Sequence, residues 1–212
     1  MKKSCIFFVS VVMFLVVAVG TALAQEVPEG FTIHKIEKGD TLEKIAPEEH
    51  HNLIMKVNRF DKKHLPIGKK ILIPVDFIKA SEYTPVPEYI EEAKEEERSI
   101  YVFLDKQYFG AYENGELVFW GPISSGRGKR MTKKGTYKAN KKELMHRSRL
   151  YGGAPMPFSV NLSKNMSETN YFLHEQDMPG YPASHGCVRL LREDAKKIYN
   201  WIKINDPVEI SS

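Results

Sequence analysis

The chain has 212 residues, 42% of them hydrophobic, which is enough for one small and one medium-sized domain. It contains 31 lysine and arginine residues against 27 aspartate and glutamate residues, so its formal net charge is +4. So small an excess of positive charge does not indicate a nucleic-acid-binding protein.

The first 24 residues are typical of a secretory signal peptide. Lys2 and Lys3 form a basic start, an apolar run covers residues 6–19, and small residues lead up to Ala24. We predict cleavage after Ala24, with an uncleaved anchor as the alternative, although the apolar run is short for a membrane span. Cleavage removes two lysines and no acidic residue, which leaves a net charge of +2. We therefore expect export to the periplasm or cell wall, with no membrane attachment afterwards.

Residues 31–75 predict a small domain in the order strand, helix, helix, strand. Asp40, with Glu43 three residues later, predicts a capping box at the start of the first helix. The apolar spacing predicts that the second helix ends near Asn58. A strand of alternating isoleucines then ends at Pro74.

The pattern GDTL…IA…N…LPIGKKILIP in this segment resembles a lysin motif (LysM). His34 replaces the usual aromatic residue, and Arg59 stands where the family often has proline. The resemblance implies binding of glycan that contains N-acetylglucosamine, in a shallow groove beside the first helix. The alternative is a lysin-like domain that has lost sugar binding and only packs on its neighbour. The matching positions are Gly39, Asp40, Thr41, Leu42, Ile45, Asn58, Leu65, Gly68, Ile71 and Pro74.

Residues 76–97 predict a linker that separates two modules. Pro85 and Pro87 favour an extended spacer, and the run EYIEEAKEEER that follows predicts a short solvated helix or a flexible strap.

Residues 98–212 predict a mostly-β domain with one main helix. Asn114-Gly115 is a strong hairpin signal between two strands, and residues 192–203 have the apolar spacing of an amphipathic helix. The basic segment SSGRGKRMTKKG lacks the glycine spacing of a phosphate-binding loop, so we expect a solvated loop. Strands are predicted at residues 99–105, 107–112, 116–124, 136–140, 156–162, 171–174 and 206–210.

The stretch HEQDMPGYPASHGCVRL, residues 174–190, holds the residues best suited to catalysis. Cys187 is the only cysteine besides Cys5. A thiol attacks as thiolate, and His174 or His185 could supply the nearby base that it needs. Gly186 allows a tight turn whose N–H groups could hold an oxyanion.

Two other readings of these residues remain open. Cys187 could be a small buried hydrophobic residue with both histidines in the core, or His174, His185 and Cys187 could bind a metal ion. Three further histidines, His50, His51 and His64, lack the spacing of metal ligands, and we expect them on the surface.

SHGCVRL before a helix, with a histidine upstream on a strand, resembles the signature of the L,D-transpeptidases of bacterial cell walls. The resemblance covers about the last half of the chain. Thr132, Gly135 and Tyr137 also match the family's TPxGxY pattern, but Lys133 replaces its proline. The family fold implies a mainly β protein: a β-sandwich catalytic domain with one main helix, preceded here by the small βααβ domain.

The resemblance also implies a mechanism that uses no cofactor and no metal. Cys187 attacks the carbonyl of the third residue of a peptidoglycan stem peptide, His174 moves the proton, and D-Ala leaves a thioester behind. An amine from another stem resolves the thioester and forms a cross-link. Ser184, His185 and Gly186 are expected to shape the turn and support the oxyanion, and Arg189 to bind substrate carboxylate or loop carbonyls.

Three alternatives to stem-to-stem cross-linking remain open. In the first, water replaces the amine and the protein is an L,D-carboxypeptidase or an amidase. In the second, the acceptor is a free D-amino acid or a lysine of a wall-attached protein, and in the third the protein is not an enzyme and only binds peptidoglycan stem peptides and glycan strands. We further expect His174 to be the base, held by a backbone carbonyl near Glu175, and the Cys187 pKa to lie well below roughly 8.5.

Overall fold

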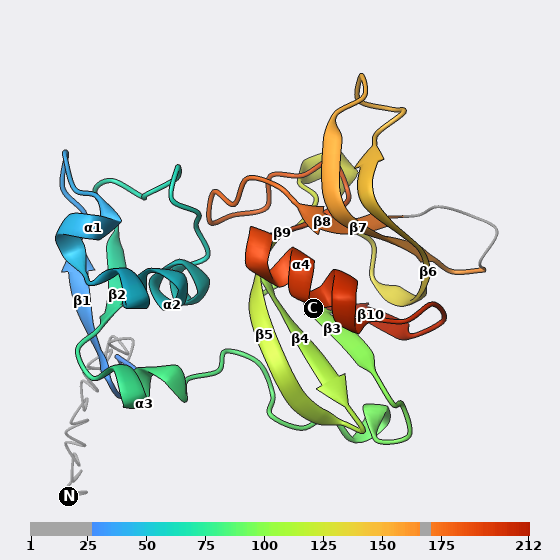
Figure 1. Ribbon diagram of the computed structural model, residues 1–212, viewed down its shortest axis with the longest axis horizontal. Coiled ribbons are helices and arrows are strands. Elements are labelled where there is room, and N and C mark those ends of the chain that lie inside the picture. The colour runs from blue at the N-terminus through green and yellow to red at the C-terminus, as the bar shows by residue number, and fades with distance from the viewer. Residues whose placement is uncertain (1–26, 166–170) are drawn as a thin grey trace, which may run out of the picture.

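The computed structural model describes residues 27–165 and 171–212, so the predicted signal peptide lies outside the described residues. Figure 1 shows a small N-terminal domain beside a larger C-terminal domain rich in strands. None of the helices in the described part of the chain is long and apolar enough to cross a membrane.

The N-terminal domain has the predicted βααβ order. An antiparallel pair of strands lies against two helices, and Ile36, Ile54 and Phe60 form the centre of the core. The elements are β1 (Phe31–Lys35), α1 (Leu42–Ile45), α2 (Glu48–Asn58) and β2 (Lys70–Pro74).

Two details of the N-terminal domain differ from the predictions. Thr41, not Asp40, is the N-cap residue of α1, and it makes no side-chain capping bond. The Asp40 carboxylate instead accepts the N–H of Glu37 at 2.8 Å, which satisfies the turn before the helix. His51 is buried rather than on the surface, and its Nε2 lies 2.9 Å from the carbonyl oxygen of Ala46.

The linker packs on both domains, through Ala80 on the N-terminal one and through Ile90 and Ala93 on the C-terminal one, while the glutamates of its acidic run are exposed as predicted. It contains α3 (Phe77–Ser81) and a 3-10 turn, η1 (Glu91–Ala93). The N–H of Ile90 donates to the Gly115 carbonyl at 2.9 Å, and the side chain of Ile90 is buried. This hydrogen bond and the burial of Ile90 attach the linker to the hairpin whose turn contains Gly115.

The C-terminal domain confirms the mainly β class. Its strands form a hydrogen-bonded ring in the order β10-β3-β4-β5-β9-β8-β7-β6. Figure 1 shows them as two groups, β3–β5 and β6–β8, with α4 packed between. The three-residue β9 was not predicted, because so short a strand carries no period. The elements are β3 (Ser99–Phe103), β4 (Tyr108–Glu113), β5 (Glu116–Ser124), η2 (Gly128–Arg130), β6 (Gly135–Arg147), β7 (Pro155–Ser163), β8 (Tyr171–Glu175), β9 (Val188–Leu190), α4 (Arg192–Trp201) and β10 (Pro207–Ser211).

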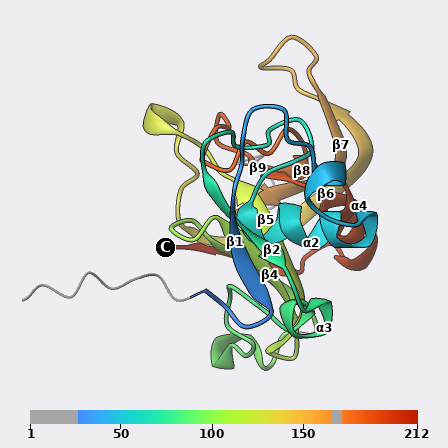
Figure 2. The same cartoon turned by 90° about the vertical axis from the view of Figure 1, so that its left-hand side faces the viewer.

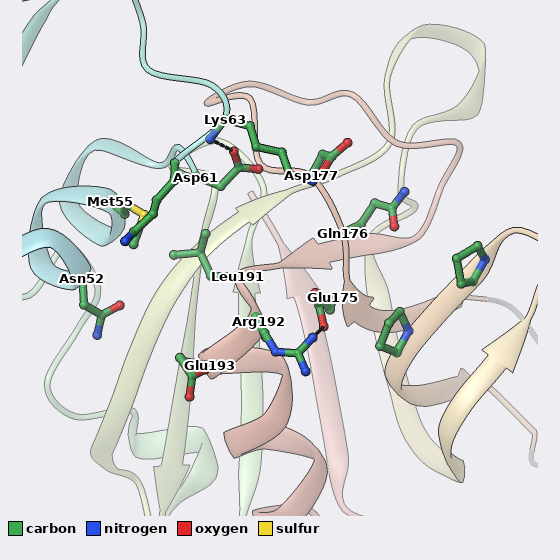
Figure 3. Close-up of a pocket in the computed structure, with 13 residues that line it drawn as sticks. Asn52, Met55, Asp61, Lys63, Glu175, Gln176, Asp177, Leu191, Arg192 and Glu193 are labelled. Atoms are coloured by element: carbon green, nitrogen blue, oxygen red, sulfur yellow. Dashed lines mark hydrogen bonds and ion pairs between the residues drawn. The ribbon is translucent and has the colours of Figure 1, made fainter. Parts of the chain in front are cut away.

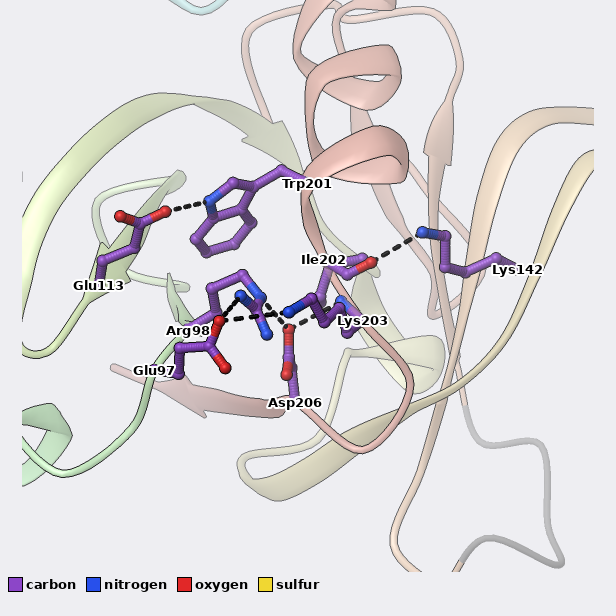
Figure 4. A network of polar contacts seen from close by, with 8 residues as sticks. All are labelled: Glu97, Arg98, Glu113, Lys142, Trp201, Ile202, Lys203 and Asp206. Carbon is purple, nitrogen blue, oxygen red and sulfur yellow. Dashed lines mark hydrogen bonds and ion pairs between the residues drawn. The ribbon is translucent and has the colours of Figure 1, made fainter.

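A polar network fixes the C-terminal end of α4 (Figure 4). Arg98 Nε donates to Asp206 at 2.9 Å, and the same carboxylate oxygen accepts the N–H of Lys203 at 2.7 Å. Lys142 Nζ donates to the carbonyl oxygen of Ile202 at 2.7 Å. These bonds satisfy backbone groups where the helix ends and hold α4 against the strands.

The two domains are in direct contact, and Figure 2 shows α2 lying across β5. Lys56 of α2 lies 3.6 Å from Asp194 of α4 and 4.6 Å from the centre of the Trp120 ring. The hydroxyl of Tyr108 donates to the Val57 carbonyl at 2.6 Å. The N-terminal domain is therefore docked on the C-terminal domain and is not a freely tethered module.

Candidate active site

The candidate site lies where β8 and β9 pair in parallel. Leu173 is opposite Val188, and both are almost fully buried in the core, at 1% and 0% exposure. Side chains alternate along a strand, so the neighbouring positions face the other way. His174, Cys187 and Arg189 therefore share one face, where all three line a pocket of about 360 Å³.

The turn before Cys187 is held by its own side chains. Ser184 Oγ donates to the carbonyl oxygen of Cys187 at 2.5 Å and accepts the N–H of Gly186 at 3.1 Å. Gly186 has φ of +121°, and a Cβ there would lie 3.3 Å from the Tyr171 ring. The turn thus requires glycine at this position.

The basic loop was predicted to be solvated, and that is wrong for residues 124–126 and for Thr132, which are buried. Thr132 Oγ1 donates to the Gly186 carbonyl at 2.7 Å and accepts the N–H of Gly126 at 2.9 Å. The N–H of Ser184 donates to the Ser125 carbonyl at 3.0 Å. The loop therefore braces the cysteine turn, and the match of Thr132 to the TPxGxY pattern was the one sequence signal for this role.

His174 is held in the orientation that the sequence suggested. Its side chain is buried, and Nδ1 lies 2.8 Å from the carbonyl oxygen of Glu175. A carbonyl can only accept, so Nδ1 carries the proton and Nε2 is left with a free lone pair. Burial lowers the pKa of His174 to about 4, although the bond to Glu175 opposes the shift.

Cys187 contradicts the expectation of a low thiol pKa. Burial raises the pKa of its thiol above the ordinary value, against the opposing effects of the Phe172 N–H and the charge of Arg189. With His174 deprotonated, the free site holds a neutral thiol and a neutral imidazole instead of an ion pair.

The structure distinguishes the second histidine from the first. His185 is exposed at the rim of the pocket and stacks on Tyr151, with ring centroids 4.8 Å apart. Lost hydration, followed by the charges of Arg130, Arg189 and Arg127, lowers the His185 pKa. Tyr151 belongs to the connection between β6 and β7, which the sequence did not connect with the site.

Arg189 is the cation closest to the chemistry. It is partly buried, and its guanidinium makes no hydrogen bond or ion pair within residues 27–165 and 171–212. Burial lowers its pKa, yet a guanidinium remains charged at any physiological pH. The pocket lining includes no carboxylate, so Arg189 is available for an anionic ligand. In the described part of the chain, no three histidine, cysteine or acidic side chains are grouped to hold a metal ion.

Comparisons with known proteins agree with both resemblances. The family model described as L,D-transpeptidase catalytic domain matches residues 97–210, which is more than half of the chain. The LysM domain model matches residues 34–74. No curated protein matched the chain.

Two solved structures are similar in fold. The L,D-transpeptidase of Stackebrandtia nassauensis is 24% identical with a TM-score of 0.51, over 63% of this chain and 62% of that one. This chain thus spans less than two thirds of that protein's length. The L,D-transpeptidase of Xylanimonas cellulosilytica DSM 15894 is 23% identical with a TM-score of 0.55, over 76% of this chain and 78% of that one. At these identities the likeness concerns the fold alone.

Proposed function

The chain belongs to the L,D-transpeptidase family, and we propose that it is a cysteine-dependent acyltransferase acting on peptidoglycan stem peptides. The observation that carries this proposal is the shared face of β8 and β9. There the buried His174, the thiol of Cys187 and the unpaired guanidinium of Arg189 line one pocket.

In the first half-reaction, Cys187 Sγ attacks the carbonyl carbon of the third stem residue. His174 Nε2 takes the thiol proton as the S–C bond forms, and then passes it to the nitrogen of the leaving D-Ala as the C–N bond breaks. Because thiol and imidazole are both neutral at rest, the proton moves during the attack rather than before it. A thioester on Cys187 remains.

The charge that develops on the carbonyl oxygen needs hydrogen-bond donors. We assign this role to the backbone N–H groups of His185 and Cys187, because those of Ser184 and Gly186 already donate to the Ser125 carbonyl and to Ser184 Oγ. The Thr132 brace keeps the turn of Ser184, His185 and Gly186 in place. Loss of one such donor in an acyl transfer costs about 3–4 kcal/mol of barrier. The Thr132 brace therefore supports catalysis by keeping these donors in position.

Arg189 binds the carboxylate of the terminal D-Ala in this proposal. The exposed Arg127 and Arg130 lie close enough to affect the His185 pKa, so the pocket mouth is positive on this side. A positive mouth attracts the free carboxylate of a tetrapeptide stem and orients its last peptide bond toward Cys187.

The N-terminal domain binds the glycan strand of the same polymer. Its match to the LysM family supports this role. Both domains fit a protein of the periplasm or cell wall, to which residues 1–24 would direct it as a cleaved signal peptide.

The proposal is tested with the secreted form and purified tetrapeptide muropeptides, with products identified by mass. We expect release of D-Ala, a thioester on Cys187 in the intact mass, and cross-links between third residues. Cys187→Ala should lose all three while its thermal unfolding stays close to wild type. Turnover by this variant at the wild-type rate would exclude Cys187 as the nucleophile, and tripeptide as the sole product would identify an L,D-carboxypeptidase.

A further inference from the structure

We propose that the cleft between the two domains binds the acyl acceptor, a second stem peptide with a free side-chain amine, so that the N-terminal domain forms one wall of the acceptor site. This inference rests on the proposed function. The cleft has a volume of about 570 Å³, and Figure 3 shows Asn52, Met55 and Lys63 on one side of it and Glu175 and Arg192 on the other.

The cleft adjoins the catalytic pocket. Pro155 and Gln176 line both spaces, and Glu175 in the cleft directly follows His174 on β8. A peptide lying in the cleft can therefore extend past Gln176 to the thioester on Cys187. The donor approaches from the Arg189 side, so the two substrates need not compete for the same space.

The two spaces differ in charge in the way that the two substrates do. Four carboxylates line the cleft, whereas the catalytic pocket has none. Three cations, Lys62, Lys63 and Arg192, accompany them. The donor presents a carboxylate, which suits the guanidinium of Arg189, and the acceptor presents an ammonium, which suits the carboxylates.

Three of the cleft carboxylates remain available to a ligand. Glu193 is exposed and makes no ion pair among the described residues. Glu175 pairs with Arg192 at 2.8 Å and Asp177 with Lys63 at 3.4 Å, and both pairs have at least one solvent-exposed partner. Such pairs contribute little free energy, so a ligand ammonium can exchange with their cations.

The remaining lining suits a peptide. The side-chain amides of Asn52 and Gln176 have no hydrogen-bond partner in the described part of the chain, and both residues line the cleft. Amides of this kind can bind the peptide groups of an extended stem. Met55, Pro157 and Leu191 supply apolar surface for its aliphatic side chain.

The fourth carboxylate, Asp61, fixes the wall of the cleft. It accepts the N–H of Met178 at 2.6 Å, and its own N–H donates to the Met178 carbonyl at 3.0 Å. These bonds tie the N-terminal domain to the loop between His174 and Cys187. A wall held in this way can place an acceptor relative to the thioester.

In the second half-reaction the acceptor ammonium first gives one proton to water. The amine nitrogen then attacks the thioester carbon, the new C–N bond forms as the S–C bond breaks, and the second amine proton reaches sulfur through His174. The products are a cross-linked peptide and the free thiol of Cys187, so that no further reactant is needed.

The experiment separates the two half-reactions in the full chain. Acylation is followed as D-Ala release and thioester mass with a donor tetrapeptide whose side-chain amine is acetylated, so that no acceptor is present. Cross-linking is followed against the concentration of an acceptor tripeptide, which lacks the terminal D-Ala and cannot act as a donor. The test variants are the double change Asp177→Asn with Glu193→Gln, and Asn52→Trp, which narrows the cleft. Glu49→Gln on the exposed side of α2 is the matched control.

We expect both test variants to raise the acceptor KM about tenfold, equivalent to ~1.4 kcal/mol, while acylation stays within twofold of wild type. Hydroxylamine, which needs no peptide site, should resolve the thioester at the wild-type rate in every variant, and the control should change nothing.

An unchanged acceptor KM in both variants, with normal acylation, would overturn the acceptor site and leave the proposed function intact. Loss of binding to stem-free glycan strands without a change in acceptor KM would make the cleft a glycan site. Absence of acylation in the wild-type protein would instead refute the proposed function.

Discussion

The neutral pairing of His174 with Cys187 predicts an unusual pH profile. Burial lowers the pKa of His174 from 6.5 to about 4, so the base remains available well into the acidic range. Between pH 7 and pH 5, a histidine of pKa 6.5 would lose neutral imidazole ~25-fold, whereas one of pKa 4 loses only about a tenth. The donor carboxylate, with a pKa of about 3.5, stays ionised throughout. We therefore expect kcat/KM for acylation to be nearly flat from pH 5 to pH 7.

The assay is single-turnover acylation by a tetrapeptide donor, because kcat/KM reports ionisations of the free enzyme. His174→Ala should abolish the reaction, and His185→Ala should keep the flat profile. A fall of more than about tenfold from pH 7 to pH 5 would refute the neutral-base reasoning. If His185→Ala loses acylation and His174→Ala does not, the roles of the two histidines are reversed.

Alkylation of the free site gives an independent check. Iodoacetamide reacts with thiolate, and burial raises the Cys187 pKa above its ordinary value. The alkylation rate should therefore still rise with pH beyond pH 9. A plateau below pH 8 would mean that the thiol ionises as the sequence alone led us to expect.

The same pKa shift of His174 has a consequence for stability. The His174 imidazole binds its second proton less readily in the folded protein than in the unfolded chain. The stabilising contribution of neutral His174 is therefore present above pH 6.5 and is lost as the pH falls toward 4. A fall of the His174 pKa from 6.5 to about 4 corresponds to ~3 kcal/mol of unfolding free energy. The free energy of unfolding of the wild-type protein should accordingly begin to fall below pH 6.5, and it should fall less in a His174→Gln variant.

The remaining predictions concern the turn, the domain contact and the N-terminal domain. Gly186→Ala should lower the free energy of unfolding in urea by about 2–3 kcal/mol, because φ is positive there and the new methyl group would crowd the Tyr171 ring. Gly152→Ala also has a positive φ but has open space around it, and it should lower the free energy of unfolding by only about 1 kcal/mol. Asp194 has a pKa raised to about 6, chiefly by burial, so its stabilising contribution is present below pH 3.8 and is lost as the pH rises through 6. The free energy of unfolding of Asp194→Asn should therefore rise by ~3 kcal/mol relative to that of the wild type between pH 4 and pH 8. A difference between the two proteins that does not change with pH would contradict this. Removal of residues 27–75, with the linker of residues 76–97 retained, should reduce sedimentation of the protein with insoluble peptidoglycan. Sedimentation equal to that of the full chain would exclude the N-terminal domain as a glycan anchor.

Much of the fold follows from local sequence patterns. Alternating apolar residues predicted most strands of the C-terminal domain, and Asn114-Gly115 marks the turn of the β4–β5 hairpin. These signals are visible because one face of each strand is buried and the other is not. The linker was predicted less well, since the contacts that bury Ile90 come from a hairpin later in the chain.

The sequence by itself determined the chemical groups of the site. One thiol, an upstream histidine and a glycine-rich turn within a short stretch are a matter of residue identity and spacing. Tertiary structure alone decided their ionisation, because the pKa values of Cys187 and His174 depend on how deeply distant strands bury them. It also decided that the N-terminal domain lies against the loop between those two residues. That arrangement rests on the contact of Asp61 with Met178, two residues far apart in sequence whose local patterns carry no sign of each other.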